Sequence, residues 1–451
     1  MSEDCTVLKT NITSLVNENP QEADEKESDK DISNKAGMEY YKTKPGKDLS
    51  IVSRFFRNRM KLMRQTIDRV YPDLEKEYRR DLSKMEEVIS NFKKNENDQN
   101  HIDYDKILHI LKTTNIQFVN VFLKGMFLNV FSELDTFTGH FLYRLFLLKP
   151  EVINGNQKQF NASEVFRCKS IDDFREKVIQ KEIEAIKRES YVDQISILEK
   201  LFHINTLKDF ENWGKYVEIT QRRNIIAHCD GIITEQYYNT CIKNKCNIYG
   251  KVGEKLNVDY EYLIKAISII EEVSIKLVQV LWRKCFKKKE CQNDFDDILN
   301  EYIYYLLIDE RWDVAIELGK FACNVIKAAT EELKIIFLIN YCIALNNMNK
   351  KEETIKLLND VDFSAIHREF LLAKYVLLED INNVVNLMIE IGDKGNYFNK
   401  STYAVFPLFK HIRQNEEFKL TYKKIFGVDL NKEEIKQKIK ENEEENPNSI
   451  N

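Results

Sequence analysis

The chain has 451 residues with a hydrophobic content of 43%, which suffices for roughly two or three buried cores and predicts a multidomain protein. Its 68 Lys and Arg residues nearly balance its 73 Asp and Glu residues, so the composition excludes a global field that attracts nucleic acid. Any contact with RNA must therefore come from local patches. Only 13 Gly and 6 Pro occur, and such sparse turn residues predict an all-α protein of helices joined by short loops.

The cysteine pattern and the apolar runs indicate the compartment. The nine cysteines include no CxxC pair, and an odd total favours reduced thiols. No segment approaches ~18 uncharged apolar residues, and the start lacks a basic region. We expect a cytoplasmic protein with no membrane span. Cys241, Cys246, Cys285 and Cys291 could be drawn as metal ligands, but their spacing lacks zinc-ribbon character, so we expect no metal and no cofactor.

The N-terminal region divides into a tail and a basic helix. Residues 1–48 are polar and predict a disordered tail. Residues 49–100 predict a basic helical segment, in which Asp68 is the only acid between Arg54 and Arg69. This helix could rest on an RNA backbone or an anionic surface. The simpler interpretation is a packed helix whose Arg and Lys side chains reach solvent.

Residues 101–291 predict a bundle of four or five antiparallel helices. Its first long helix is expected near 115–148, with further helices near 170–189, 191–203, 207–229 and 257–286. Apolar side chains at three- and four-residue steps should face the bundle core along the first helix. They are Phe118, Val121, Phe122, Met126, Val130, Phe131, Leu134, Phe137 and Phe141.

Residues 292–428 carry a weak internal repeat. Ten-residue segments whose matched core positions are Ala315, Thr354 and Val384 align without gaps, at offsets of 39 and 30 residues that bracket the helix-pair period of about 34. The stretch LINYCIALNNMNKKEETIKLLND resembles a tetratricopeptide unit. We therefore predict a short α-solenoid of helix pairs, followed by a charged tail over residues 429–451.

The segment RNIIAH places Arg223 and His228 close together in the chain. An Arg can hold a phosphate with two parallel hydrogen bonds, and a His with a reference pKa of about 6.5 can exchange protons near neutral pH. RNA supplies its own nucleophile, the 2′-hydroxyl group. These two side chains therefore suffice in principle to cleave RNA without a metal.

Placement on a helix both supports and complicates this interpretation. Asn224 and His228 extend the inward-facing stripe of Phe210, Trp213 and Val217, and burying each polar group unpaired would cost about 1 to 3 kcal/mol. Arg223 lies about 140° around the helix from His228, so the two do not share a face. Three solutions remain open: Arg223 bends back, the helix ends near His228 with Gly231 as its C′ residue, or a second copy supplies one of the groups.

The string QRRNIIAHCDG, residues 221–231, resembles the signature of the HEPN superfamily of helical-bundle ribonucleases. The resemblance covers the predicted bundle. It implies a metal-independent endoribonuclease, often a toxin or an abortive-infection or antiviral defence effector, with its site assembled across a symmetric dimer. It assigns Arg223 and His228 as catalytic and Asn224 as the characteristic polar neighbour. The products would carry 2′,3′-cyclic phosphate ends. Glu133 and Asp135 could line the groove opposite or be solvated helix positions.

Further cations are candidate RNA contacts. Arg222 could bind the neighbouring phosphate. In WRKCFKKKE, residues 282–290, the candidates are Arg283, Lys284 and Lys287, with Trp282 and Phe286 as stacking groups, although a solvated helix end is an equal alternative.

The expected partners follow from these assignments. They are an RNA substrate, a second copy bound through the bundle, and a protein or peptide trigger or antitoxin on the C-terminal repeats. The rival interpretation is a non-catalytic interaction or nucleotide-binding protein, in which the bundle dimerises and His228 is a satisfied core histidine.

Overall fold

A computed structural model describes residues 45–94, 116–154, 160–363 and 366–431. The prediction of an all-α fold is confirmed: these residues form helices and no strand, with one isolated bridge between Ile232 and Lys255. Most of the two predicted tails, residues 1–44 and 432–451, lies outside the described residues. Pro45–Asp48, predicted as part of the first tail, instead begin a helix.

The chain divides into two compact units. The first, which we call the bundle unit, comprises the described residues up to Ile298, and the second, the repeat unit, comprises those from Leu299 onward. The boundary falls inside helix α13 (Lys289–Ile308), a few residues beyond the predicted change from bundle to repeats.

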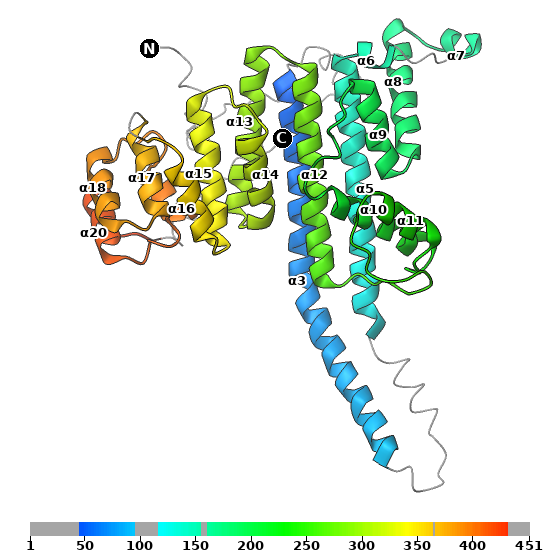
Figure 1. Cartoon of the computed structure of the whole chain (residues 1–451), viewed down its shortest axis with the longest axis horizontal. Helices are drawn as coiled ribbons and strands as arrows, with labels where there is room; N and C mark the ends of the chain where they lie inside the picture. The colour runs from blue at the N-terminus through cyan, green and yellow to red at the C-terminus, as the bar shows by residue number, and fades with distance from the viewer. Residues whose placement is uncertain (1–44, 95–115, 155–159, 364–365, 432–451) are drawn as a thin grey trace, which may run out of the picture. The chain divides into compact units, whose positions relative to one another are not determined.

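In the bundle unit, the helices α3 (Pro45–Lys94), α5 (Ile116–Leu148) and α12 (Tyr260–Cys285) pack against one another (Figure 1). Helix α10 (Trp213–His228) contacts α5, α9 (Tyr191–Phe202), α11 (Glu235–Lys243) and α12, while α8 (Ile171–Arg188) packs on α5 and α9. The short helices α6 (Glu151–Asn154) and α7 (Ala162–Phe166) complete the unit. Four of these ranges match the expected helices closely, and α10 begins six residues later than predicted.

The basic helix α3 belongs to this unit and is not a separate segment. Its apolar side chains Leu49, Phe56, Met60 and Ile67 are buried against the bundle, as the packed-helix interpretation requires. Its C-terminal half runs beyond the ends of α5 and α12 (Figure 1).

The core stripe of α5 differs from the prediction at its N-terminal end. Phe118 and Val121 are 58% and 64% exposed, whereas Val119, Leu123 and Phe127 are buried. The rest of the predicted stripe, from Val130 to Phe141, is largely buried. The pattern alone did not show which of two adjacent apolar rows faces the core near the helix start.

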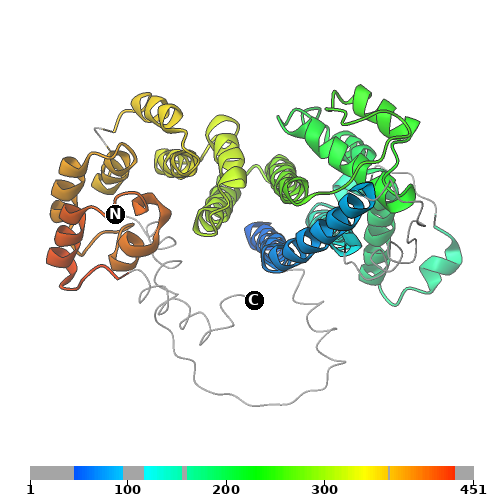
Figure 2. The ribbon, with the colours of Figure 1, turned by 90° about the horizontal axis from the view of Figure 1, so that it is seen from below.

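The repeat unit continues from α13 through successive helices that follow one another along a curve (Figure 2). These are α14 (Trp312–Asn324), α15 (Glu331–Asn347), α16 (Lys351–Asn359), α17 (Arg368–Leu377), α18 (Ile381–Ile391), α19 (Lys400–Val405), the 3-10 turn η3 (Pro407–Phe409) and α20 (Glu416–Phe426). The three aligned segments fall on α14, α16 and α18, each the second helix of a pair. Their matched positions Ala315, Thr354 and Val384 are fully buried.

The turns inside these helix pairs repeat as well. Glu310, Asn349 and Glu379 have φ angles of 55°, 59° and 60°, and they follow the same 39- and 30-residue offsets. After each, the next amide donates to a carbonyl five residues earlier, as when Arg311 N bonds Leu306 O at 2.8 Å. This is the Schellman helix ending, so the weak sequence repeat reflects a repeated turn as well as a repeated core.

No helix among the described residues has the length and apolar character needed to cross a membrane.

Candidate active site

Helix α10 lies in the interior of the bundle unit. From Tyr216 to Ile226 its side chains are buried, except Arg223 and Asn224, which are half-buried. The helix ends at His228, and the chain then turns through Asp230 and Gly231, with φ angles of 49° and 82°. The predicted helix end near His228 is confirmed, but Cys229 is the C-cap, so Asp230 and not Gly231 occupies the C′ position. The amide of Gly231 donates to the carbonyl of Ile225 at 2.9 Å, which closes the final turn.

The side chain of Arg223 is half-buried and its guanidinium is incompletely paired. Its Nη1 donates to Oδ1 of Asn224 at 3.2 Å, and its Cζ lies 5.9 Å from the centroid of the Phe131 ring. Its Nε is buried and has no hydrogen-bond partner among the described residues. A buried donor left unpaired costs about 1 to 3 kcal/mol, so a side-chain movement that exposed this atom to an anionic ligand would recover that energy.

Four helices converge on Asp135 beside this arginine. The hydroxyl of Tyr191, on α9, donates to Oδ1 of Asp135 at 3.0 Å. Burial raises the pKa of Asp135, whereas the Tyr191 hydrogen bond and the charges of Lys187 and Arg223 lower it, and burial prevails. Burial and the Asp135 charge in turn raise the pKa of Tyr216. Asp135 is therefore part of the Arg223 environment, and its interpretation as a solvated position is wrong.

Glu133 lies elsewhere on α5. Its carboxylate is 3.6 Å from Nε of Arg59 on α3, so it serves the contact between those helices.

His228 is exposed at the last residue of α10. The prediction that it extends the inward stripe is wrong, and so is the rival interpretation of a satisfied core histidine. The helix ends before another turn can cover this position. Nearby Asp230 pairs with Lys124 of α5 at 3.3 Å and with Lys255, and these bonds, that to Lys255 foremost, lower the pKa of Asp230. His228 thus lies two residues before an acid that two lysines bind, one half-buried and one exposed, so this cluster carries a net positive charge.

Arg222 is more deeply buried than Arg223, although its Nη2 likewise has no hydrogen-bond partner among the described residues. It is 5% exposed, its Nε lies 2.7 Å from Glu218, and its Nη1 donates to the carbonyl of Asn257 at 3.1 Å. Its Cζ is 3.9 Å from the centroid of the Tyr262 ring. Arg222 is therefore not available for the predicted phosphate contact, because its side chain is enclosed in an internal ion pair.

The cations near the end of α12 lie far from Arg223. Arg283 pairs with Asp296 at 2.7 Å, burial lowers the pKa of Arg283, and Trp282 is fully buried, so neither fits the predicted role. Lys284 and Lys287 are exposed. At 1.5 Å per residue, Lys284 lies about 33 Å along the helix from Tyr262, the residue that contacts Arg222. These lysines do not join the α10 site.

The sequence patterns did not identify three further residues that lie near α10. Tyr191, Lys124 and Lys255 approach α10 from other elements, and only the tertiary fold brings them there. The acid Asp135 was recognised only as one of two positions that could line a groove. No periodic or local motif marks these four side chains as neighbours of Arg223 or His228.

Among the described residues, no three His, Cys, Asp or Glu side chains gather as metal ligands. The four cysteines considered as a metal set therefore do not form one cluster.

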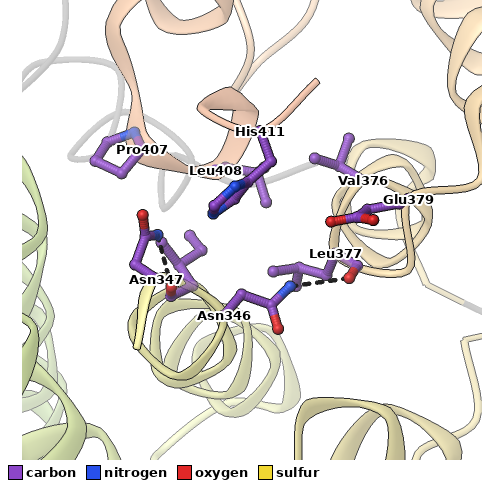
Figure 3. A pocket seen from close by; sticks show the side chains of 9 residues that line it. Asn346, Asn347, Val376, Leu377, Glu379, Pro407, Leu408 and His411 are labelled. Atoms are coloured by element: carbon purple, nitrogen blue, oxygen red, sulfur yellow. Dashed lines mark hydrogen bonds between the residues drawn. The ribbon is translucent and has the colours of Figure 1, made fainter. Parts of the chain in front are cut away.

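The repeat unit contains a small hollow between α15, α17 and the η3 region (Figure 3). Asn346, Asn347, Glu379 and His411 are among the side chains around it. The hollow has room for about one water molecule, so it does not accept a peptide side chain without movement of its walls.

Comparison with family models, curated proteins and solved structures gives no match for this chain. The resemblance of residues 221–231 to the HEPN signature therefore rests on the motif and on the helical bundle around it.

Proposed function

We propose that the bundle unit is a metal-independent endoribonuclease that cleaves RNA through attack of a 2′-hydroxyl on the adjacent phosphate. The observation that carries this proposal is the state of Arg223, whose buried Nε has no hydrogen-bond partner among the described residues, one helical turn before the exposed His228. An incompletely satisfied cation and an accessible imidazole on one helix supply the two groups that phosphate stabilisation and proton transfer need.

In this mechanism Arg223 stabilises the negative charge that grows on the phosphate oxygens. Asn224 and Phe131 hold its guanidinium, and Asp135 supplies a nearby negative charge that orients it. His228 moves the protons that leave the 2′-hydroxyl or arrive at the departing 5′-oxygen. Lys124 and Lys255 would contact flanking phosphates, because both lie beside Asp230 two residues from the histidine.

The face separation of Arg223 and His228 supports a site completed by a second copy. The two residues belong to one helix, and about 140° of rotation separates them. A symmetric dimer through the bundle would place the arginine of one protomer near the histidine of its partner. On this account each dimer holds two composite sites.

The direct test is RNA cleavage by the purified full chain in EDTA. Wild type should yield fragments with 2′,3′-cyclic phosphate ends, and His228→Ala and Arg223→Ala should each lose at least about 100-fold in rate. Matched controls are His411→Ala and Arg175→Ala, which remove an exposed histidine and an exposed arginine away from the site. Intact RNA at high protein concentration, or equal rates for all five proteins, would reject the proposal.

Mixing the two inactive variants tests the composite site. A mixed dimer of Arg223→Ala and His228→Ala protomers keeps one intact site if the groups come from different protomers, so the mixture should regain up to about a quarter of wild-type activity. A site contained within one protomer predicts no recovery.

The repeat unit is proposed to bind a protein or peptide that controls the nuclease, as expected of a toxin or defence effector. Stacked helix pairs support this role, since such arrays present extended surfaces. The hollow in Figure 3 is too small to be that surface by itself. Growth arrest on expression, relieved by His228→Ala but not by His411→Ala, would support the effector role, and arrest by both variants would oppose it.

A second candidate is nucleotide binding by the bundle unit. A shallow groove between α10 and α12 carries Lys215, Lys265 and the exposed ring of Tyr249 on its walls. Two cations and an aromatic ring suit a phosphate and a base. Mass analysis of the denatured, purified protein would detect a retained nucleotide, and this candidate predicts its loss in Lys265→Ala.

A further inference from the structure

Helix α11 ends in the same type of turn that recurs in the repeat unit. Lys245 has a φ of 54°, its amide donates to the carbonyl of Ile242 at 3.0 Å, and the amide of Cys246 donates to the carbonyl of Cys241 at 2.9 Å. These two bonds define a Schellman ending, in which the side chains at C3 and C″ meet. Here the residues in those two positions are both cysteines.

The turn fixes the two cysteines at a distance that a disulfide can span. The 2.9 Å bond between Cys246 N and Cys241 O, with standard backbone lengths, limits their Cα separation to about 6.8 Å. Disulfides bridge Cα atoms roughly 4.4 to 6.8 Å apart. The two thiols also act on each other, since this mutual interaction raises the pKa of Cys241 and lowers that of Cys246.

The surroundings give the two thiols different exposure. Cys241 is fully buried in a cluster with Ile225, Ile233 and Tyr237, while Cys246 is half-buried at the edge of that cluster. An oxidant from solvent therefore meets Cys246 first. Cys241 stands behind it as the second thiol.

We propose that Cys241 and Cys246 form a reversible dithiol–disulfide site that reacts with a hydroperoxide. The Cys246 thiolate attacks one peroxide oxygen, the O–O bond breaks, and a sulfenic acid and hydroxide form. The Cys241 sulfur then attacks the sulfenic sulfur, the S–S bond forms, and the hydroxyl leaves with the Cys241 proton as water. Two thiols and one hydrogen peroxide thus give one disulfide and two waters. This site is independent of the nuclease proposal.

The consequence for the fold lies on α10. The cluster that contains Cys241 includes Ile225, which sits between Arg223 and His228 in the sequence. The backbone at Lys245 also packs on α10, since a Cβ at Gly214 would lie 3.3 Å from the Lys245 carbonyl oxygen. A disulfide would therefore cross-link the turn at the end of α11, which packs against the candidate active-site helix α10.

Tryptic mapping of the native full chain provides the test. Cleavage after Arg223, Lys243, Lys245 and Lys251 separates the two cysteines onto the peptides 224–243 and 246–251. After treatment with hydrogen peroxide and blocking of free thiols, these two peptides should appear as one linked species that dithiothreitol separates.

Peptide 224–243 also holds Cys229, which packs against the same cluster, so the matched variants are Cys229→Ser and Cys241→Ser. Cys229→Ser should keep the link, whereas Cys241→Ser should lose it and leave Cys246 as a sulfenic acid that dimedone labels. Fragmentation of the wild-type linked species locates the bond even if a variant fails to fold. A link through Cys229, or peptides that stay separate while Cys246 is over-oxidised, would overturn the proposal.

Discussion

The hydroxyl of Tyr191 donates a 3.0 Å hydrogen bond to Asp135, and Asp135 lies within electrostatic reach of Arg223. The three residues come from α9, α5 and α10. The bond satisfies a carboxyl group that burial would otherwise leave poorly solvated. It thereby fixes the negative charge that we propose orients the arginine.

Tyr191→Phe should remove this bond and lower the cleavage rate without changing the cyclic-phosphate product. A lost hydrogen bond to a charged group corresponds to about 1.5 to 3 kcal/mol, and a part of this should appear as a rate loss of about tenfold. Rates on an oligonucleotide, together with urea unfolding curves, separate the effect on activity from that on stability. Tyr238→Phe in the same unit is the control. An unchanged cleavage rate for Tyr191→Phe would contradict the proposed role of Asp135 in orienting Arg223.

Glu218 is the centre of a buried polar network in the bundle unit. It is 3% exposed and accepts bonds from Nε of Arg222 at 2.7 Å and from the hydroxyls of Tyr237 and Tyr262 at 2.8 Å. Glu218→Gln should cost about 3 to 5 kcal/mol in the free energy of unfolding, because it leaves a buried guanidinium without its counter-charge. Glu235→Gln, at an exposed position, should cost almost nothing by the same urea titration.

The outcome of a double substitution sharpens that test. Glu218→Gln with Arg222→Met removes both charges, so it should recover part of the lost stability. If the double variant is less stable than Glu218→Gln alone, the ion pair is not the main contribution of Arg222.

Gly231 and Gly253 form a matched pair for the turn after α10. Their φ angles are 82° and 90°. A Cβ at Gly231 would collide with the backbone carbonyl oxygen of Leu256, whereas a Cβ at Gly253 would meet no atom within 4 Å. Gly253→Ala should cost about 1 to 2 kcal/mol for its left-handed conformation alone. Gly231→Ala should cost distinctly more, since a backbone carbonyl must move. If both variants lose the same stability in thermal unfolding, the Leu256 carbonyl moves aside without cost and the prediction is wrong.

Asp297 should make stability depend on pH. Burial, followed by repulsion from Asp296 and Asp294, raises its pKa to about 6. Because the folded state then holds this proton more tightly than the unfolded state, the free energy of unfolding should fall as pH rises from about 4 to about 6. Allowing for solvent screening, the loss should be about 1 to 2 kcal/mol.

Asp297→Asn should therefore be more stable than wild type at pH 7 and no different near pH 4, as measured by urea unfolding. Asp172→Asn, at an exposed position, is the control. A pH profile of Asp297→Asn that parallels wild type would contradict the assignment.

The helices were predictable because their apolar periodicity is strong and their turns are distinct. The end of α10 near His228 was predictable from the turn residues that follow it, although Asp230, and not Gly231, is the first of them with a positive φ angle. The side-chain environments were not predictable in the same way. Adjacent residues Arg222 and Arg223 look alike in the sequence, yet one is enclosed by Glu218 and Tyr262 and the other faces Asp135.

That difference arises from tertiary packing. Which face of α10 meets α12 and which meets α5 depends on helices that are distant in the sequence, since α5 ends at Leu148 and α12 begins at Tyr260, and no local pattern records it. The same limit explains Phe118 and Val121, which fit a core stripe by spacing but lie on the row beside it. The approach of Cys241 to Cys246 is easier to predict from the sequence, because the two residues lie only five positions apart at the end of one helix.

The central claim is that His228 and Arg223 cleave RNA through its own 2′-hydroxyl. The most direct measurement compares two oligonucleotides in EDTA, one all-ribose and one with a single 2′-deoxy residue on the 5′ side of the mapped cut, each treated with wild type and with His228→Ala. Wild type should cut the first to a cyclic-phosphate end and leave that position of the second intact, and His228→Ala should cut neither. Cleavage by wild type at the deoxy position, or cleavage by His228→Ala at the wild-type rate, would contradict the account.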